Sequence, residues 1–297
     1  MKVGLVDIEP KVFNTALMQI AAYHKSIGDE VEWWSPLTAH CFPKVYCSSL
    51  FDFTDKTELP KRAICGGTGF DIKSKLPCAI ENCDLDYSIY PKCETSYIWF
   101  SRGCVRNCGF CCVLQKEGYI RPVRSKNLNP NGRYITVQDN SFFANPCWPG
   151  AIMQLQKWGQ PVDFQGIDIR RITGEQGRAL ITLRFHKQLK FAWDRPKDEE
   201  AVMSGIKRLL GYVKPRRCMC YVLIGFDSTE EEDMHRVTTL DLLGIDAFVM
   251  PYDRSDLYQK TFARWVNHKA IHKSVKWEDY RGRVNQQEAA GNGWKAR

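Results

Sequence analysis

Three cysteines lie close together near the middle of the chain, with the spacing Cys104-x3-Cys108-x2-Cys111. A short loop with this spacing can bring three thiolates to one side, and Cys thiolates are the usual ligands of iron–sulfur clusters. Three thiolates leave the fourth iron of a cubic cluster open, and an open coordination position is typical of a catalytic metal site. The loop therefore predicts a [4Fe–4S] cluster with one reactive iron.

A structural zinc site is the alternative for the same loop, because Cys112 would supply a fourth thiol. The side chains of adjacent cysteines diverge, so Cys111 and Cys112 are poor joint ligands of one ion. The cluster is favoured for this reason, and Cys112 is predicted to be a buried thiol.

The cysteine loop resembles the CxxxCxΦC motif of the radical S-adenosylmethionine (SAM) superfamily, with Phe110 as the aromatic residue Φ. The resemblance implies that the open iron chelates SAM and that an electron from a partner such as flavodoxin or ferredoxin cleaves it. The product is a 5′-deoxyadenosyl radical, which would modify an unidentified RNA, peptide or small molecule. The alternative is a non-catalytic iron–sulfur or zinc protein that retains the fold.

The same resemblance implies SAM contacts at the ends of strands. Asp139 and Asn140 stand where the family usually has a Gly-Gly-Glu-like segment that contacts the SAM amine, so the chain departs from the pattern there. Arg170 is expected to pair with the SAM carboxylate and Asp168 with a ribose hydroxyl, although a structural ion pair between the two is the alternative. Gly225 is expected to admit the adenine ring, because glycine permits close approach of the backbone.

The elements that would position these residues are short β-rich runs alternating with helical stretches. In residues 1–94, strands are predicted at 2–8, 30–34 and 62–65, with a helix over 12–27. In residues 95–280, strands are predicted at 97–100, 133–137, 162–169, 189–193, 218–224 and 247–250. Helices fill the gaps at 149–158, 174–187, 198–212, 229–243 and 255–267, with Thr229 and Glu232 forming a capping box.

The predicted fold class is α/β. Residues 95–280 are predicted to form a partial (β/α)6 radical SAM barrel, in which functional groups gather at the carboxyl ends of the strands. Residues 1–94 are predicted to form a small Rossmann-like domain in front of it, and residues 281–297 a polar tail.

The first domain resembles, more weakly, the one that precedes the barrel in cobalamin-dependent members and in methylthiotransferases. Asp7-Ile8-Glu9 lacks the His that would be the lower cobalamin ligand, so cobalamin would depend on packing and on the Gly66-Gly67-Thr68-Gly69 turn. A second iron–sulfur cluster, held by the cysteines of this domain, is the other alternative. The preferred interpretation is that these cysteines are scattered thiols that hold no cluster. The cysteines in question are Cys41, Cys47, Cys65, Cys78, Cys83 and Cys93.

Composition limits the class of protein further. The chain has 297 residues, of which 44% are hydrophobic and 26% charged, as in an ordinary folded protein. It shows no membrane span or export signal, so a cytoplasmic location is expected and its 13 cysteines are predicted to be thiols or ligands rather than disulfides. The net charge of +8 makes nucleic acid a candidate partner, although the basic residues are spread along the sequence.

Overall fold

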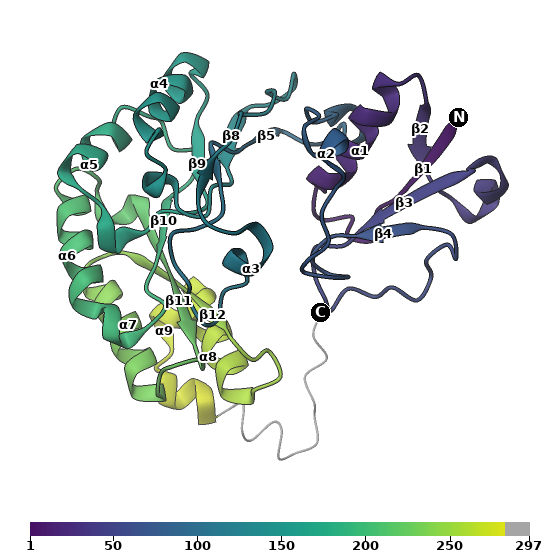
Figure 1. Cartoon of the computed structure of the whole chain (residues 1–297). Helices are drawn as coiled ribbons and strands as arrows, with labels where there is room; N and C mark the ends of the chain where they lie inside the picture. The colour runs from purple at the N-terminus through teal and green to yellow at the C-terminus, as the bar shows by residue number, and fades with distance from the viewer. Residues whose placement is uncertain (283–297) are drawn as a thin grey trace. The chain divides into compact units, whose positions relative to one another are not determined.

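The computed structural model describes residues 1–282, and its larger sheets are built from parallel strands with helices between them (Figure 1). The predicted α/β class is confirmed. The chain forms two compact units, the first ending at Asn140 and the second beginning at Ser141. The tail predicted for residues 281–297 lies, from residue 283 onward, outside the described residues. Within residues 1–282, no helix is both long and apolar enough to cross a membrane.

The first unit begins with a four-stranded parallel sheet in the order β2-β1-β3-β4. Its strands are β1 (Lys2–Val6), β2 (Glu30–Trp33), β3 (Lys44–Ser48) and β4 (Ile64–Gly66). Strand β3 was not predicted, because its five residues lie among loop-forming residues and show no clear period. It is nevertheless buried from Val45 to Ser48 and forms the centre of the sheet beside β1.

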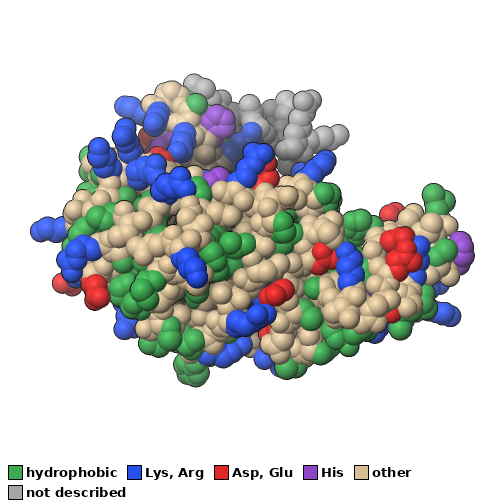
Figure 2. All heavy atoms as spheres, turned by 90° about the horizontal axis from the view of Figure 1, so that it is seen from above, with side chains coloured by type: hydrophobic (Ala, Val, Ile, Leu, Met, Phe, Trp, Pro, Cys, Tyr) green, Lys and Arg blue, Asp and Glu red, His purple; other side chains and the backbone are tan. Residues whose placement is uncertain are grey.

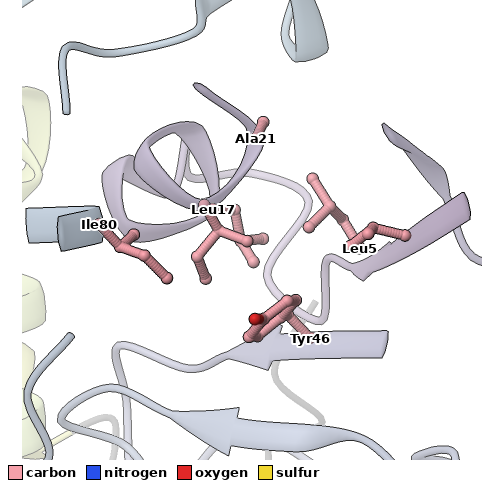
Figure 3. Packing of buried hydrophobic residues seen from close by; sticks show 7 residues of the cluster. Leu5, Leu17, Ala21, Tyr46 and Ile80 are labelled. Carbon is pink, nitrogen blue, oxygen red and sulfur yellow. The ribbon is translucent and has the colours of Figure 1, made fainter. Parts of the chain in front are cut away.

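Helix α1 (Thr15–Ser26) packs on this sheet. Asn14 caps its first turn by accepting hydrogen bonds from the N–H groups of Ala16 and Leu17, which explains where the helix starts. Its apolar residues meet the strands and the short helix α2 (Cys78–Glu81) in one core (Figure 3). The members labelled there are Leu5, Leu17, Ala21, Tyr46 and Ile80.

The rest of the first unit surrounds the three cysteines. Strand β5 (Thr95–Ile98), which was predicted two residues later at 97–100, pairs in parallel with β8 (Tyr134–Val137). Between them the chain forms an antiparallel pair, β6 (Ser101–Arg102) with β7 (Arg121–Pro122), and the short helix α3 (Val113–Glu117). These three short elements were not predicted, since none is long enough to show a hydrophobic period. Three-residue-per-turn helices η1 (Pro36–Cys41) and η2 (Tyr87–Ile89) complete the unit.

The second unit alternates strands and helices. Its strands are β9 (Val162–Phe164), β10 (Leu189–Ala192), β11 (Cys218–Ile224) and β12 (Asp246–Pro251), and the last three form a parallel sheet in sequence order. The α-helices are α4 (Trp148–Trp158), α5 (Gly174–Leu180), α6 (Glu199–Leu210), α7 (Glu230–Leu242), α8 (Leu257–Asn267) and α9 (Lys269–Ser274). Short 3-10 helices lie at Phe142–Ala144 (η3), Ile169–Arg171 (η4), Pro196–Asp198 (η5) and Pro215–Arg217 (η6).

Two predicted elements of this unit are shorter than expected. The strand predicted over 162–169 ends at Phe164, and the end of the predicted range instead forms η4, which Asp168 caps by accepting a hydrogen bond from the Arg170 N–H. The helix predicted over 174–187 ends at Leu180. The partial (β/α)6 barrel remains a prediction, while the parallel α/β character of the unit is established.

Candidate functional site

The cysteine loop begins at a position that only glycine can fill. Gly103 has φ +84°, and a Cβ atom there would lie 2.4 Å from the Tyr119 carbonyl oxygen and 2.5 Å from that of Gly118. Directly after it, the Cys104 N–H donates to the Gly118 carbonyl across 3.2 Å. The two ends of the loop therefore meet, and residues 104–118 form a loop between β6 and β7 that this hydrogen bond closes.

Asp139 holds the strand that leads into this loop. Its side chain is buried, with Oδ1 accepting from the Phe100 N–H at 2.9 Å and Oδ2 from the Ser101 hydroxyl at 2.5 Å. Burial raises the pKa of Asp139, although these hydrogen bonds favour its charged form. Asp139, predicted to contact the SAM amine, thus has hydrogen-bond partners within the protein on both oxygens.

Glu117 holds the other side of the loop. Its Oε2 accepts from the Gly103 N–H and from Asn140 Nδ2, both at 2.9 Å, and its Oε1 pairs with Arg102 at 2.7 Å. Asn140, the second residue predicted to contact SAM, therefore meets the cysteine loop through Glu117. Glu117 was not predicted, and no sequence signal marks it, because its partners come from two other segments, Arg102–Gly103 and Asn140.

The three predicted ligand thiols lie near one another at the protein surface. Cys104 and Cys108 are partly exposed and Cys111 is exposed. Burial of the sulfur raises the pKa of Cys111, and the charges of Cys112, Cys108 and Cys104 raise it further, so all of them lie within electrostatic range. Cys112 is exposed, so the prediction that it is a buried thiol is wrong: it starts α3, and that first turn faces solvent.

The donor set of the loop fits an iron–sulfur cluster in its chemistry, since it offers three thiols on one short segment. The ligands are not preassembled, however. In residues 1–282, no group of three or more Cys, His, Asp or Glu side chains is arranged to hold a metal ion. Phe110, beside Cys111, is half-buried. Binding of a cluster would therefore require the thiol side chains to converge.

In the second unit, Asp168 and Arg170 form an ion pair. Arg170 Nε lies 2.8 Å from Asp168 Oδ1, and its Nη1 lies 2.7 Å from Asp198 Oδ2, so one guanidinium joins two carboxylates. Arg195 also pairs with Asp198, at 2.9 Å. Nearby, burial raises the pKa of Asp194, although Arg170 and Arg236 attract its charged form. The structural ion pair, which the sequence left open, is present, and the prediction that these residues bind SAM stays untested.

Gly225 follows β11 and has φ +79°. A Cβ atom there would lie 2.1 Å from Cδ of Gln259, so the close approach that requires glycine is made by a side chain of the protein. Gln259 in turn accepts from the Asp253 N–H at 2.9 Å. The capping box predicted for Thr229 and Glu232 is confirmed at the start of α7. The adenine contact of Gly225 remains a prediction.

The turn considered for cobalamin is packed against the protein itself. Cβ atoms at Gly67 and Gly69 would lie 2.3 Å from the carbonyl oxygens of Ser49 and Phe51, respectively. The buried carboxylate of Glu9 accepts from the N–H groups of Leu50 and Phe51 in the same loop. The backbone donors after β3 are thus taken by Glu9, and these residues do not fit a cobalamin site.

The cysteines considered for a second cluster do not converge as a set. Cys47 and Cys65 are partners in the β3–β4 register, and burial raises the pKa of Cys47 to about 12, with Cys65 adding to the effect. Cys83 and Cys93 donate to the backbone carbonyls of Ala79 and Thr95. These six cysteines are therefore scattered thiols with one neighbouring pair, Cys47 and Cys65.

A buried ion pair was missed by sequence reasoning. Lys190 on β10 places Nζ at 2.7 and 2.9 Å from the two carboxylate oxygens of Asp163 on β9, and both side chains are buried. Charged residues are rarely buried unless paired. The available signal was a charged residue inside each of two otherwise apolar strands.

No known protein-family model matches the chain. No curated protein is similar enough in sequence to match it. The assignment of function therefore depends on the residues themselves.

Proposed function

We propose that this protein is a radical SAM enzyme, in which Cys104, Cys108 and Cys111 hold a [4Fe–4S] cluster. The observation that carries the proposal is the CxxxCxxC loop, with its three neighbouring, partly or fully exposed thiols on a segment closed at both ends. When bound, the cluster supplies the electron that cleaves SAM to a 5′-deoxyadenosyl radical.

The chain's own residues contribute by fixing the backbone of the loop. Gly103 permits the turn, and Asp139 holds Phe100 and Ser101 just before it. Glu117 holds the Gly103 N–H and so keeps the start of the loop against its end. Such support limits the movement of the three thiols, and fixed ligands lower the entropy lost when a metal site forms.

The SAM contacts belong to the same proposal. Asp139 and Asn140 would approach the SAM amine, Arg170 its carboxylate, Asp168 the ribose and Gly225 the adenine. Charge is the physical reason, because an ammonium group seeks a carboxylate and a carboxylate seeks a guanidinium. Since Asp168 and Asp198 already neutralise Arg170, a SAM carboxylate would have to displace one of them.

The test is to incubate anaerobically reconstituted protein with SAM and dithionite and to measure 5′-deoxyadenosine. We expect it to form with the wild type and to be absent with Cys104→Ala, whereas Cys112→Ala, a neighbouring cysteine outside the motif, should retain activity. Bound iron without any 5′-deoxyadenosine would reject the enzyme and favour a non-catalytic iron–sulfur protein. Binding of one zinc ion through Cys112 would reject the cluster altogether.

A further inference from the structure

Basic side chains gather at one edge of the sheet of the second unit. The parallel register places the starts of β10, β11 and β12 side by side, with Leu189 level with Cys218 and Met219 level with Asp246. The segments before β10 and β11, together with α9, carry exposed cations at this edge. We call this set the basic edge: Arg184, Lys187, Lys214, Arg216, Arg217, Lys269 and Lys273.

Hydrogen bonds tie these segments together. Gln188 Nε2 donates to the Arg216 carbonyl oxygen at 3.1 Å and to Asp246 Oδ2 at 2.6 Å, so it joins the starts of three strands. Lys269 Nζ donates to the same Asp246 oxygen at 2.5 Å, which attaches α9 to the edge. Residues far apart in the sequence therefore form one continuous surface, although the sequence suggests a dispersed charge.

The positive charge of the basic edge exceeds what neighbouring carboxylates neutralise. Among the nearby carboxylates, Asp246 pairs with Lys269 and Asp241 with His272, and the exposed Glu278 lies in the wall of the adjoining hollow. Arg216, Arg217 and Lys214 extend from one exposed turn. On the face drawn in Figure 2, many of the Lys and Arg side chains gather at the upper left. Clustered positive charge of this kind attracts polyanions.

A hollow of about 770 Å³ adjoins the basic edge. Lys273 belongs to both, and the wall also includes Lys276, the buried Trp265 and the partly exposed Trp277. The Trp277 ring also packs against Trp265 and Tyr280 and lies under the Arg281 guanidinium, so a base would meet the part of the ring that stays exposed. An aromatic ring beside cations suits a nucleobase, because bases stack on aromatic side chains while their phosphates meet Lys and Arg. An acidic protein segment would use the charges but not the ring, and a duplex has no unpaired base to offer.

We propose that the basic edge and this hollow bind a single strand of nucleic acid, with phosphates along the basic edge and an unpaired base against Trp277. The surface is a property of the second unit alone. The proposal does not depend on the cluster, and the cysteine variants should bind the strand as the wild type does.

The test is fluorescence anisotropy of a labelled single-stranded RNA of about 20 nucleotides with the full chain. Lys214→Glu/Arg216→Glu/Arg217→Glu should weaken binding at least about tenfold at about 0.1 M salt and flatten the dependence of log K on log salt by about 2. The matched control is Lys61→Glu/Arg62→Glu/Lys75→Glu. It changes net charge equally through exposed residues of the first unit and should leave affinity within about twofold.

Three results would overturn the proposal. If the two triple variants lost RNA affinity equally, binding would depend on net charge alone. Displacement of the RNA by polyglutamate as readily as by unlabelled RNA would indicate an acidic protein partner. If a duplex bound as tightly as the single strand, no unpaired base would be needed in the hollow. If the first triple variant does not fold, Arg217→Ala replaces it, with an expected change of about 1 in the salt slope.

Discussion

The cysteine loop and the Arg170 cluster use charged side chains in opposite ways. Around the loop, Asp139 and Glu117 each accept a hydrogen bond from a backbone N–H as well as from side chains, and the predicted ligand thiols lie at the surface. In the cluster, Arg170 meets Asp168 and Asp198, so the residues that carry the predicted chemistry satisfy one another. A candidate residue is therefore better judged by what its reactive atoms contact than by its type.

The largest effect is expected from removing the three cysteines of the loop. Cys104→Ala/Cys108→Ala/Cys111→Ala should remove nearly all of the about four irons per chain and the absorbance near about 400 nm, because the loop is the predicted source of all three ligands. Iron analysis and visible spectra of anaerobically reconstituted protein measure this. Retention of about half the iron would make cysteines of the first sheet ligands as well, against the scattered thiols observed there.

Arg170→Ala tests the ion-pair cluster of the second unit. It leaves the carboxylates of Asp168 and Asp198 without this partner, and the loss of a largely buried ion pair should cost about 2–4 kcal/mol of unfolding free energy. Urea unfolding measures this, with the exposed Arg171→Ala as control. Strongly weakened SAM binding in Arg170→Ala, with the iron content intact, would support the proposed contact with the SAM carboxylate, whereas unchanged SAM affinity would leave Arg170 as a structural residue.

Glu9→Gln tests a buried carboxylate that accepts hydrogen bonds from two backbone N–H groups and two hydroxyl groups. Burial opposes its charge, but hydrogen bonds from Leu50, Phe51, Thr54 and Ser49 prevail and lower the pKa of Glu9. The substitution should cost about 2 kcal/mol at neutral pH, since it loses charge-assisted hydrogen bonds.

The pH dependence of this cost has a defined sign. A lowered pKa in the folded state means that Glu9 contributes its full stabilisation above the pKa of an unfolded Glu, about 4.3, and loses it as pH falls through the folded value. The unfolding free energies of the wild type and of Glu9→Gln should therefore converge as the pH falls below about 4. If the difference in unfolding free energy stayed constant down to about pH 3, the shape of the Glu9 side chain rather than its charge would cause the stabilisation.

Glu117→Gln should have the smallest effect on stability, about 1 kcal/mol, because the pair with Arg102 is partly exposed and glutamine still accepts one hydrogen bond. Amide exchange at Gly103 should nevertheless become faster, while Gln115→Ala on the exposed side of α3 should leave it unchanged. Unchanged exchange in Glu117→Gln would show that Gly103 and Cys104 hold the loop without Glu117.

Much of the fold could be predicted because its elements have a period of their own. The end of α1 near Gly28 was predicted, although the helix starts at Thr15 rather than Val12, and the apolar run of β11 was placed correctly from Cys218 to Ile224. Strand β3 and the β6–β7 pair could not be predicted. Each is short, and each is stabilised by a neighbouring strand rather than by its own sequence.

By itself, the sequence determined the spacing of Cys104, Cys108 and Cys111, the parallel α/β class and the capping of α7 by Thr229. These depend on covalent distance or on a few neighbouring residues. Only the tertiary structure decided that Glu117 holds Gly103, that Asp198 shares Arg170, and that Gln188 gathers a basic edge from separate segments. The physical reason is that hydrogen bonds and ion pairs act over a few ångströms in space, and nothing in a linear sequence records which distant residues meet.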